Sequence, residues 1–277
     1  MIVDAHHHFW DPSRADYPWL TEELAAIRRR FGPDDLAPHL LRRGVDGTVV
    51  VQARSSLDET RELLALAGEV PWLLGVVGWV DLTDPAVGDV LAELRGDALV
   101  GVRHQVHDEP DPSWLLRADV DRGLAAVERA GLVYDLLVRQ RELPAALAVA
   151  RAHPGLRLVV DHLAKPSLRT GDTNAWAEGL AALAAQPNVH CKLSGLVTEA
   201  DPQTPLVPYL QRVLDWFGPE RCLFGSDWPV CLLAASYERV VEAAKTGLEA
   251  AGLDDGEMVR VFGANAIEVY GLDVTER

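Results

Sequence analysis

The sequence opens with IVDAHHHFWD, residues Ile2–Asp11, in which a short apolar run leads directly into three consecutive histidines. The apolar residues before the histidines are typical of a β-strand. A purification tag would be longer and would lie in a Gly/Ser-rich linker, which argues against a tag. The histidines are therefore either buried structural residues or a set of ligands, and the rest of the sequence has to distinguish these two readings.

Apolar runs of the same kind recur along the chain, and most are nearly continuous, as in parallel strands covered on both faces. They are spaced by roughly 25–33 residues after the first, which is the length of a βα unit. We predict eight strands, at Ile2–His8, Thr48–Gln52, Leu73–Val80, Leu99–Val106, Leu132–Val138, Leu156–His162, Val189–Leu193 and Cys222–Ser226.

Helical patterns separate these strands. We predict helices at Leu57–Ala67, Pro85–Leu94, Asp119–Ala130, Leu143–Ala152, Trp176–Ala185, Pro205–Phe217 and Ser236–Ala250. Eight strands alternating with helices predict an α/β fold, a (β/α)8 barrel formed as one domain by residues 1–277. An open doubly wound sheet is the alternative, but the sequence contains no GxGxxG or GxxxxGK motif to support a nucleotide site.

The first connection, from Phe9 to Leu41, is unusually long, and such insertions are often functional. Its aromatic residues, Trp10, Tyr17 and Trp19, favour an ordered loop folded over the mouth of the barrel. We interpret the run Arg28–Arg30 as a solvated helical face in preference to an anion site.

Composition excludes several classes of partner. The chain of 277 residues is 48% hydrophobic and 25% charged, as in a soluble globular protein, and its net charge of −16 argues against nucleic acid or an anionic membrane surface. Three cysteines without a CxxC pair suit a reducing compartment. The sequence shows no basic and apolar leader and no apolar run of about 18 residues, so we expect a cytoplasmic protein.

Polar residues interrupt the predicted strands at their carboxyl ends, where (β/α)8 barrels carry their chemistry. Each of them alone could be a helix cap or a buried structural residue, but their joint placement predicts a site. They are His6, His8, Gln52, Arg103, His104, Asp161, His162, Lys192 and Asp227. Because side chains alternate along a strand, Asp4, His6 and His8 should share one face and His7 the other. Two histidines so placed can reach a single metal ion or oxyanion.

Six segments together carry a family resemblance: DAHHHFWD, GVVGWVDL, GVRH, VVDHLAKP, CKLSG and LFGSDWPV. In this order they resemble the sugar-lactonase branch of the amidohydrolase superfamily, and they run from the first strand to the last. The resemblance implies a hydrolase of carbohydrate metabolism that opens the ester of an aldonolactone such as L-fuconolactone or L-rhamnonolactone. The segments are far more specific for the branch than for the substrate.

The resemblance also implies roles for individual residues. Asp227 would activate a water molecule, and His6, His8 and His162 would polarise the lactone carbonyl. One divalent ion, with zinc the best match to a nitrogen-rich set, would be held by His6, His8, His162 and Asp227. Catalysis without a metal is the alternative. A binuclear centre is not expected, because residues 136–140 (LLVRQ) lack the histidine that many relatives carry there, and Arg103-His104 replaces a bridging ligand.

The candidate substrate contacts are Arg103, His104, Gln52, Lys192, Trp10 and Trp228. For the polar members, a structural ion pair under the barrel rim is the alternative. Only Arg103 among the arginines is well placed at the mouth, which favours a neutral polyhydroxylated lactone over a dicarboxylated aromatic one. The remaining alternatives are a decarboxylase on the same barrel and a ligand-binding barrel without catalysis. We expect a monomer or a homodimer.

Overall fold

Eight parallel strands follow one another in sequence order around one sheet in the computed structural model of the chain, which describes residues 1–96, 98–168, 173–201 and 203–274. All eight predicted strands are confirmed. They are β1 Val3–His7, β2 Gly47–Val51, β3 Leu73–Gly78, β4 Leu99–His104, β5 Val133–Leu136, β6 Leu158–Val160, β7 Val189–Leu193 and β8 Cys222–Phe224. The predicted (β/α)8 barrel is therefore the fold of the chain.

The barrel closes between its last and first strands through backbone contacts just beyond β8. The amide of His8 donates to the carbonyl of Trp228 (2.7 Å), and the amide of Asp227 donates to the carbonyl of His6 (2.8 Å). His7 and Trp228 form an isolated parallel bridge. The seam of the barrel is thus made by residues that the sequence analysis placed in or beside the site.

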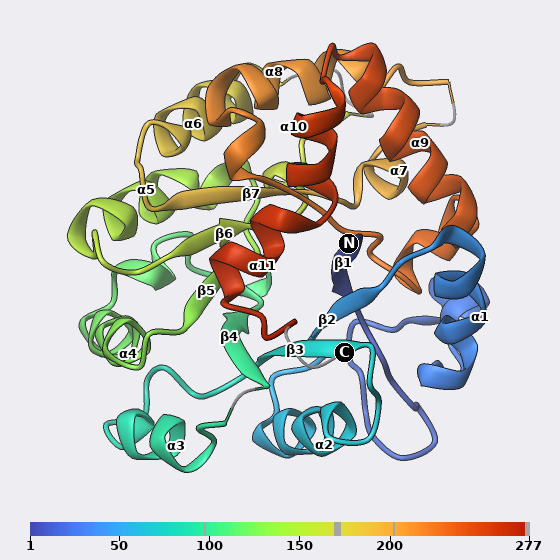
Figure 1. Cartoon of the computed structure of the whole chain (residues 1–277). Coiled ribbons are helices and arrows are strands. Elements are labelled where there is room, and N and C mark those ends of the chain that lie inside the picture. Colours follow the sequence, from blue (N-terminus) through green and yellow to red (C-terminus); the bar gives the residue numbers. More distant parts are fainter. Residues whose placement is uncertain (97, 169–172, 202, 275–277) are drawn as a thin grey trace.

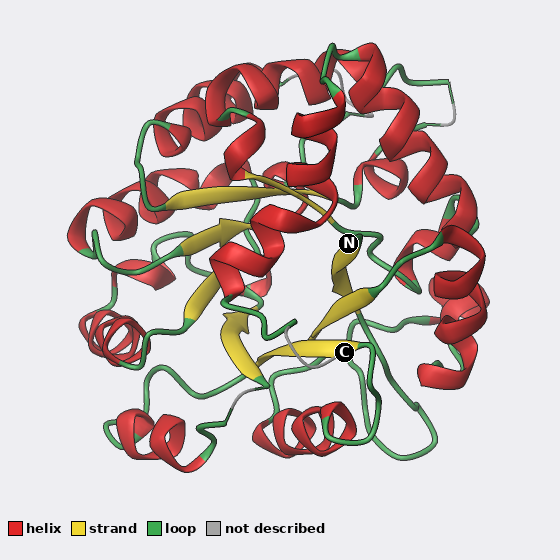
Figure 2. Cartoon of the chain, in the orientation of Figure 1, coloured by secondary structure: helices red, strands yellow, loops and turns green. Residues whose placement is uncertain are grey.

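Helices form a ring outside the strands (Figures 1 and 2). They are α1 Pro33–Arg43, α2 Leu57–Ala67, α3 Val87–Glu93, α4 Ala118–Arg129, α5 Leu143–Ala152, α6 Asn174–Ala184, α7 Leu196–Glu199, α8 Val207–Phe217, α9 Tyr237–Ala250, α10 Asp255–Val259 and α11 Asn265–Tyr270. The seven predicted helices are all present, and α2 and α5 have the predicted bounds. Helix α1, in the long first connection, and the short helices α7, α10 and α11 were not predicted.

Helix α11 covers the amino end of the barrel (Figure 1), which is filled with apolar side chains. Val3, Val49 and Val159 from the strands belong to one buried cluster with Ala266 and Val269 of α11. Burial of such side chains contributes about 1.5–3 kcal/mol each to the free energy of folding. This end of the barrel is therefore closed by packing.

The long first connection is partly helical. Helix α1 begins at Pro33, and Asp35 caps it by accepting a hydrogen bond from the amide of Gly32 (2.9 Å). The loop before it is folded around Trp10, whose ring packs edge-on against Trp19 (5.1 Å) and Phe31 (5.6 Å). Arg28–Arg30 is exposed as expected, but the predicted helical face is wrong, because the 3-10 helix Glu22–Ile27 ends before it.

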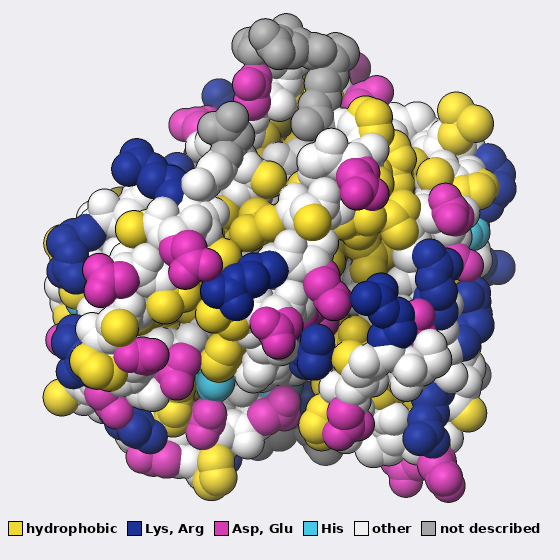
Figure 3. All heavy atoms as spheres, turned by 90° about the horizontal axis from the view of Figure 1, so that it is seen from below, with side chains coloured by type: hydrophobic (Ala, Val, Ile, Leu, Met, Phe, Trp, Pro, Cys, Tyr) yellow, Lys and Arg dark blue, Asp and Glu magenta, His cyan; other side chains and the backbone are white. Residues whose placement is uncertain are grey.

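Acidic, basic and hydrophobic side chains are interspersed on the face shown in Figure 3. Among the described residues, no helix is both long and apolar enough to cross a bilayer.

Candidate active site

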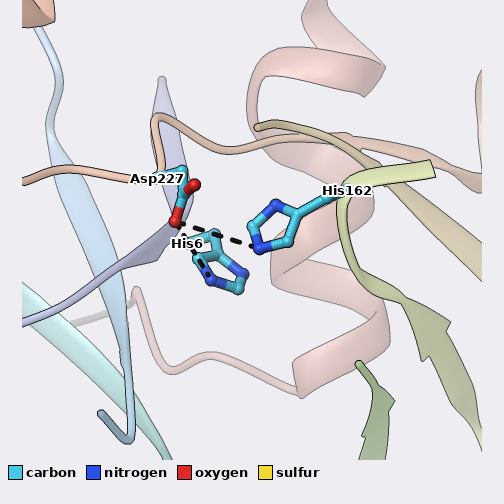
Figure 4. A group of neighbouring side chains, drawn as sticks. All are labelled: His6, His162 and Asp227. Atoms are coloured by element: carbon cyan, nitrogen blue, oxygen red, sulfur yellow. Dashed lines mark ion pairs between the residues drawn. The ribbon is translucent and has the colours of Figure 1, made fainter. Parts of the chain in front are cut away.

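The four residues predicted to form the centre of the site converge at the carboxyl end of the barrel. The Oδ1 atom of Asp227 lies 3.5 Å from Nε2 of His8, 3.8 Å from Nε2 of His6 and 3.9 Å from Nε2 of His162. All four side chains are buried. Figure 4 shows the imidazoles of His6 and His162 facing the carboxylate from β1 and from the segment after β6.

The first strand does not alternate as predicted. The carboxylate of Asp4 accepts hydrogen bonds from the amide of Ser226 (2.8 Å) and the hydroxyl of Tyr237 in α9 (3.2 Å), so Asp4 points toward the helices. The pairing of β1 with β2 shifts register between Asp4 and His7. This irregularity turns His6 toward the barrel interior, and the prediction that Asp4 shares a face with His6 and His8 is wrong.

His7 lies on the opposite face from His6 and His8, as predicted. Its Nε2 atom lies 2.8 Å from the hydroxyl of Thr48 on β2, and its ring packs edge-on against Phe9 (4.8 Å). Burial lowers the pKa of His7 well below its usual value. These contacts make His7 a neutral packing residue beside the site.

A left-handed turn positions His162. Strand β6 ends at Val160, two residues earlier than predicted, and residues His162, Leu163, Ala164 and Lys165 all have positive φ, at 53, 53, 56 and 48°. This conformation costs non-glycine residues roughly 1–2 kcal/mol each, so other contacts must hold it. The indole Nε1 of Trp176 donates to the carbonyl of Leu163 (2.6 Å), which fixes the turn from α6.

Ser194 and Gly195, which directly follow β7, contact the ring of His162. Its Nδ1 atom lies 2.8 Å from the hydroxyl of Ser194. Gly195 has a φ of +69°, and a Cβ there would lie 2.8 Å from Cγ and Nδ1 of His162. Glycine is therefore required at this position by both its backbone conformation and the approach of the ring. Ser194 and Gly195 were not predicted as site residues.

A layer of buried charges lies next to the histidines. Arg103 on β4 donates to Asp161 Oδ2 (2.9 Å) and to the carbonyl of Gln52 (2.6 Å). Lys192 on β7 is fully buried and lies between Asp161 and Asp135. Sequence analysis missed Asp135, although a carboxylate inside the apolar run VYDLLV was a usable signal.

The predicted substrate contacts on β4 have protein partners in the structure. Both ring nitrogens of His104 are engaged: Nδ1 accepts from the indole of Trp79 (3.0 Å), and Nε2 lies 2.7 Å from a carboxylate oxygen of Glu109. The ring of His104 is also stacked on Trp114 at 4.2 Å. Arg103 is held by Asp161 and Gln52 as described above. These contacts have the form of structural pairs under the rim, and a direct role of Arg103, His104 or Gln52 on the substrate stays a prediction.

The two tryptophans predicted to contact the substrate are deeply buried. Trp228 is 1% exposed and packs edge-on against Phe31 (5.3 Å), while Trp10 is 3% exposed and its ring lies 6.3 Å from that of His8. Trp10 donates through Nε1 to the carbonyl of Ile27 (3.1 Å). Both residues therefore pack beside the histidines, Trp10 from the first connection and Trp228 from the segment after β8.

Burial sets the charge state of the site. It lowers the pKa of His6 well below its usual value and that of His162 to about 3, although the Asp227 and Asp161 carboxylates oppose the shift at His162. Burial by itself would raise the pKa of Asp227, but His162 and the hydrogen bond with His8 hold it below its ordinary value. At neutral pH, His6 and His162 are therefore neutral and Asp227 is ionised.

His6, His162 and Asp227 offer ligand atoms that all lie within 4.8 Å of one another, close enough to share one divalent ion, and His8 lies beside them. The Nε2 atoms of His6 and His8 lie 3.1 Å apart, and Asp227 lies 3.5–3.9 Å from all three rings. Two ligands on a tetrahedral zinc are separated by about 3.4 Å. Because Nδ1 of His8 faces the carbonyl of Val51 (2.7 Å), its Nε2 is the atom that can bind a metal. Nitrogen-rich sets of this kind suit zinc.

Comparison with known proteins identifies the family. The family model described as Amidohydrolase matches residues 3–272. A curated L-fucono-1,5-lactonase of Burkholderia ambifaria is 42% identical over 98% of this chain and 96% of its own, and one of Burkholderia multivorans is 41% identical over 98% and 96%. The predicted resemblance to the sugar-lactonase branch is thus confirmed.

The fold is shared over the same extent. A crystal structure of an amidohydrolase from Burkholderia multivorans with bound zinc superposes with a TM-score of 0.94 at 41% identity, covering 99% of this chain and 100% of the other. The barrel, its site and these relatives lead to one conclusion: the chain belongs to the amidohydrolase family.

Proposed function

We propose that the protein hydrolyses the ester bond of a small sugar lactone, with an aldono-1,5-lactone of the L-fucono type as its substrate. The observation that carries the proposal is the Asp227 carboxylate within 3.5–3.9 Å of three imidazole nitrogens at the carboxyl end of the barrel. The full-length similarity to two curated L-fucono-1,5-lactonases supports the substrate class.

Asp227 is the base in the first step. Its ionised carboxylate accepts a proton from a water molecule, which then attacks the lactone carbonyl. Negative charge develops on the carbonyl oxygen, where hydrogen-bond donors or cations held in place beforehand lower the barrier. His6 and His162 lie beside the carboxylate and can supply such donors, whereas His8 uses its Nδ1 proton on the carbonyl of Val51.

The second step breaks the ring ester. The tetrahedral anion collapses, the bond between the carbonyl carbon and the ring oxygen breaks, and the protonated Asp227 returns its proton to the departing oxygen. The product is the open hydroxy acid, and Asp227 is again ionised. No covalent bond to the protein is formed.

A metal would be held by His6, His8, His162 and Asp227. When bound, a zinc ion would supply Lewis-acid polarisation of the lactone carbonyl. The 3.1–3.9 Å separations among the donor atoms and the zinc bound in the Burkholderia multivorans structure support zinc as the ion.

The arginines near the mouth favour a neutral substrate. Arg103 faces Asp161 at 2.9 Å. Two arginines that follow β2 and β5 are also paired, Arg54 with Glu59 at 3.7 Å and Arg139 with Glu199 at 3.7 Å. A guanidinium that is already paired is a poor receptor for a substrate carboxylate. This pairing weakens the alternative of a dicarboxylated aromatic lactone.

A panel of lactones tests the proposal. Aldono-1,5- and 1,4-lactones are assayed with a pH indicator, before and after chelation and with zinc added back, beside an aromatic dicarboxylated lactone and a hydroxybenzoate. We expect acid release from L-fucono-1,5-lactone at the highest kcat/KM. Carbon dioxide release from the benzoate, or hydrolysis restricted to the aromatic lactone, would overturn the assignment.

We also propose, as expected from the sequence, that the protein is a monomer or a homodimer and lies in the cytoplasm. Size-exclusion chromatography with light scattering tests the oligomeric state.

A further inference from the structure

The six side chains predicted to contact the substrate leave little surface for the hydroxyl groups of a sugar. Five of them are at most 4% exposed, namely Trp10, Gln52, Arg103, Lys192 and Trp228. Both ring nitrogens of the sixth, His104, already face protein groups. Each hydroxyl group of a bound sugar lactone needs hydrogen-bond partners in place of water. We therefore looked for polar side chains beside the histidines that are still partly exposed.

Glu199 is such a side chain. It is the last residue of α7, which begins directly after Gly195, the glycine packed against the ring of His162. Four residues span about one turn of an α-helix, so Glu199 lies close to the site. Its side chain is 20% exposed, whereas that of His162 is 4% exposed. Glu199 thus offers a carboxylate that solvent can reach beside the buried histidine.

Two cations flank this carboxylate. Nζ of Lys165 lies 3.6 Å from Oε1 of Glu199, and Nη1 of Arg139 lies 3.7 Å from Oε2. Lys165 is held next to His162, because its amide donates to the carbonyl of His162 (2.8 Å). Arg139, Lys165 and Glu199 follow β5, β6 and β7 in turn, so three neighbouring strands bring them together at the carboxyl end of the barrel. We call these three residues the mouth cluster.

The charges of the mouth cluster attract one another without forming hydrogen bonds. An N–H···O hydrogen bond spans 2.7–3.2 Å between its heavy atoms, and the two separations here are longer. A hydroxyl group suits this arrangement, because it can donate to the carboxylate and accept from the ammonium or the guanidinium. A ligand carboxylate would instead be repelled by Glu199. The mouth cluster therefore favours a neutral polyhydroxylated ligand.

We propose that Glu199 is a specificity-determining residue, which accepts hydrogen bonds from ring hydroxyl groups of the lactone while Lys165 and Arg139 donate to the same groups. This inference rests on the proposed function and names the side chain that selects a sugar lactone over a plain one. Sequence analysis did not single out Glu199, because the short helix α7 that carries it was not predicted.

A comparison of two substrates gives the first test. L-fucono-1,5-lactone and δ-valerolactone share the six-membered ester ring, but δ-valerolactone has no hydroxyl groups. The ratio of their kcat/KM values therefore measures the recognition of hydroxyl groups. In Glu199→Leu we expect this ratio to fall about 10- to 100-fold, the effect of losing one hydrogen bond to a charged group. General damage to the site would lower both values together and leave the ratio unchanged.

Glu93→Leu is the matched control. Glu93 also pairs with an arginine, Arg61 at 2.9 Å, but it lies on α3 in the outer ring of helices. We expect both kcat/KM values of this variant to match those of wild type. A wild-type ratio in Glu199→Leu, or an equal fall of the ratio in Glu93→Leu, contradicts the proposal.

Binding of a sugar lactam gives the second test, which needs no turnover. A lactam with the hydroxyl groups of L-fucono-1,5-lactone has a ring N–H in place of the ring oxygen and resists hydrolysis. In calorimetric titrations we expect Glu199→Leu to bind it at least about tenfold more weakly than wild type and Glu93→Leu. Equal affinity in all three proteins, or no binding to wild type, overturns the proposal. A wild-type protein that binds the lactam through Glu199 but hydrolyses no lactone would refute the proposed function alone.

Discussion

At the amino end of the barrel, Val3, Val49 and Val159 pack against one another and against α11, whereas at the carboxyl end the same sheet carries histidines, carboxylates and Lys192. Both ends are buried, but the contacts that hold them differ in kind. Apolar packing has no direction and depends on volume. The polar end depends on which atom donates and which accepts, so a change of one atom there can remove a function while the fold persists.

The largest effect is expected at the polar end. Asp227→Asn keeps the shape of the side chain but removes the base, and general bases contribute about 10²–10⁴-fold to rates. We expect kcat to fall about 10³-fold, with the circular dichroism spectrum and Tm close to wild type. Steady-state kinetics on the best lactone measures the change. A variant with most of the wild-type rate would show that Asp227 is not the base.

The apolar end should respond in the opposite way. Leu74 belongs to the cluster at the amino end and is 6% exposed. Leu74→Ala leaves a cavity and should reduce the free energy of unfolding by about 2–4 kcal/mol. We expect kcat to stay near wild type at a temperature where the variant is folded. Urea denaturation and kinetics on the same preparation separate the two effects, and a loss of kcat with unchanged stability would break the comparison.

A methyl group beside His162 tests how tightly the polar end is built. In Gly195→Ala, the new Cβ would lie 2.8 Å from the ring, so His162 must shift. We expect kcat/KM to fall about 10- to 100-fold, as for other small displacements of catalytic groups. Gly131→Ala is the control, since Gly131 has a similar φ of +72° but no atom near its Cβ position. Equal loss of activity in both variants would point to backbone strain instead of displacement.

The smallest effect is expected at an ion pair between α1 and α9 on the outside of the barrel. The carboxylate of Glu238 in α9 is partly buried, which by itself would raise its pKa, but hydrogen bonds from Arg42 and with His39 lower the pKa to about 2. Because folding lowers the pKa of Glu238, its ionised carboxylate stabilises the folded state at pH values above 4.5, the pKa in the unfolded chain. This contribution disappears as the pH falls toward 2.

Glu238→Gln should therefore cost about 1 kcal/mol near neutral pH and progressively less below pH about 4. Urea denaturation of both proteins between pH 3 and 7 measures the difference. A difference in unfolding free energy that grows as the pH falls would contradict the assignment.

The sequence predicted the barrel well because apolar parallel strands and amphipathic helices are local patterns. The same patterns located His6, His8, His162 and Asp227, since strand ends meet at one rim. Local patterns could not show the irregularity that turns Asp4 outward, because it depends on pairing with β2.

The buried pairs were equally hidden from the sequence. Lys192 meets Asp135 and Asp161 only in the folded barrel, and Tyr270 reaches Asp135 from the far end of the chain. A lysine at a strand end looks the same in sequence whether it binds a substrate or fills an internal ion pair. The left-handed run at His162–Lys165 has no glycine to reveal it.

The seam between the two ends of the chain has a consequence for folding. The amide of Asp227 reaches the carbonyl of His6 across about 220 residues of intervening sequence, so the hydrolytic centre cannot exist in a nascent chain that ends before Asp227. Regain of turnover during renaturation should consequently report ring closure itself, later than any spectroscopic signal from individual helices.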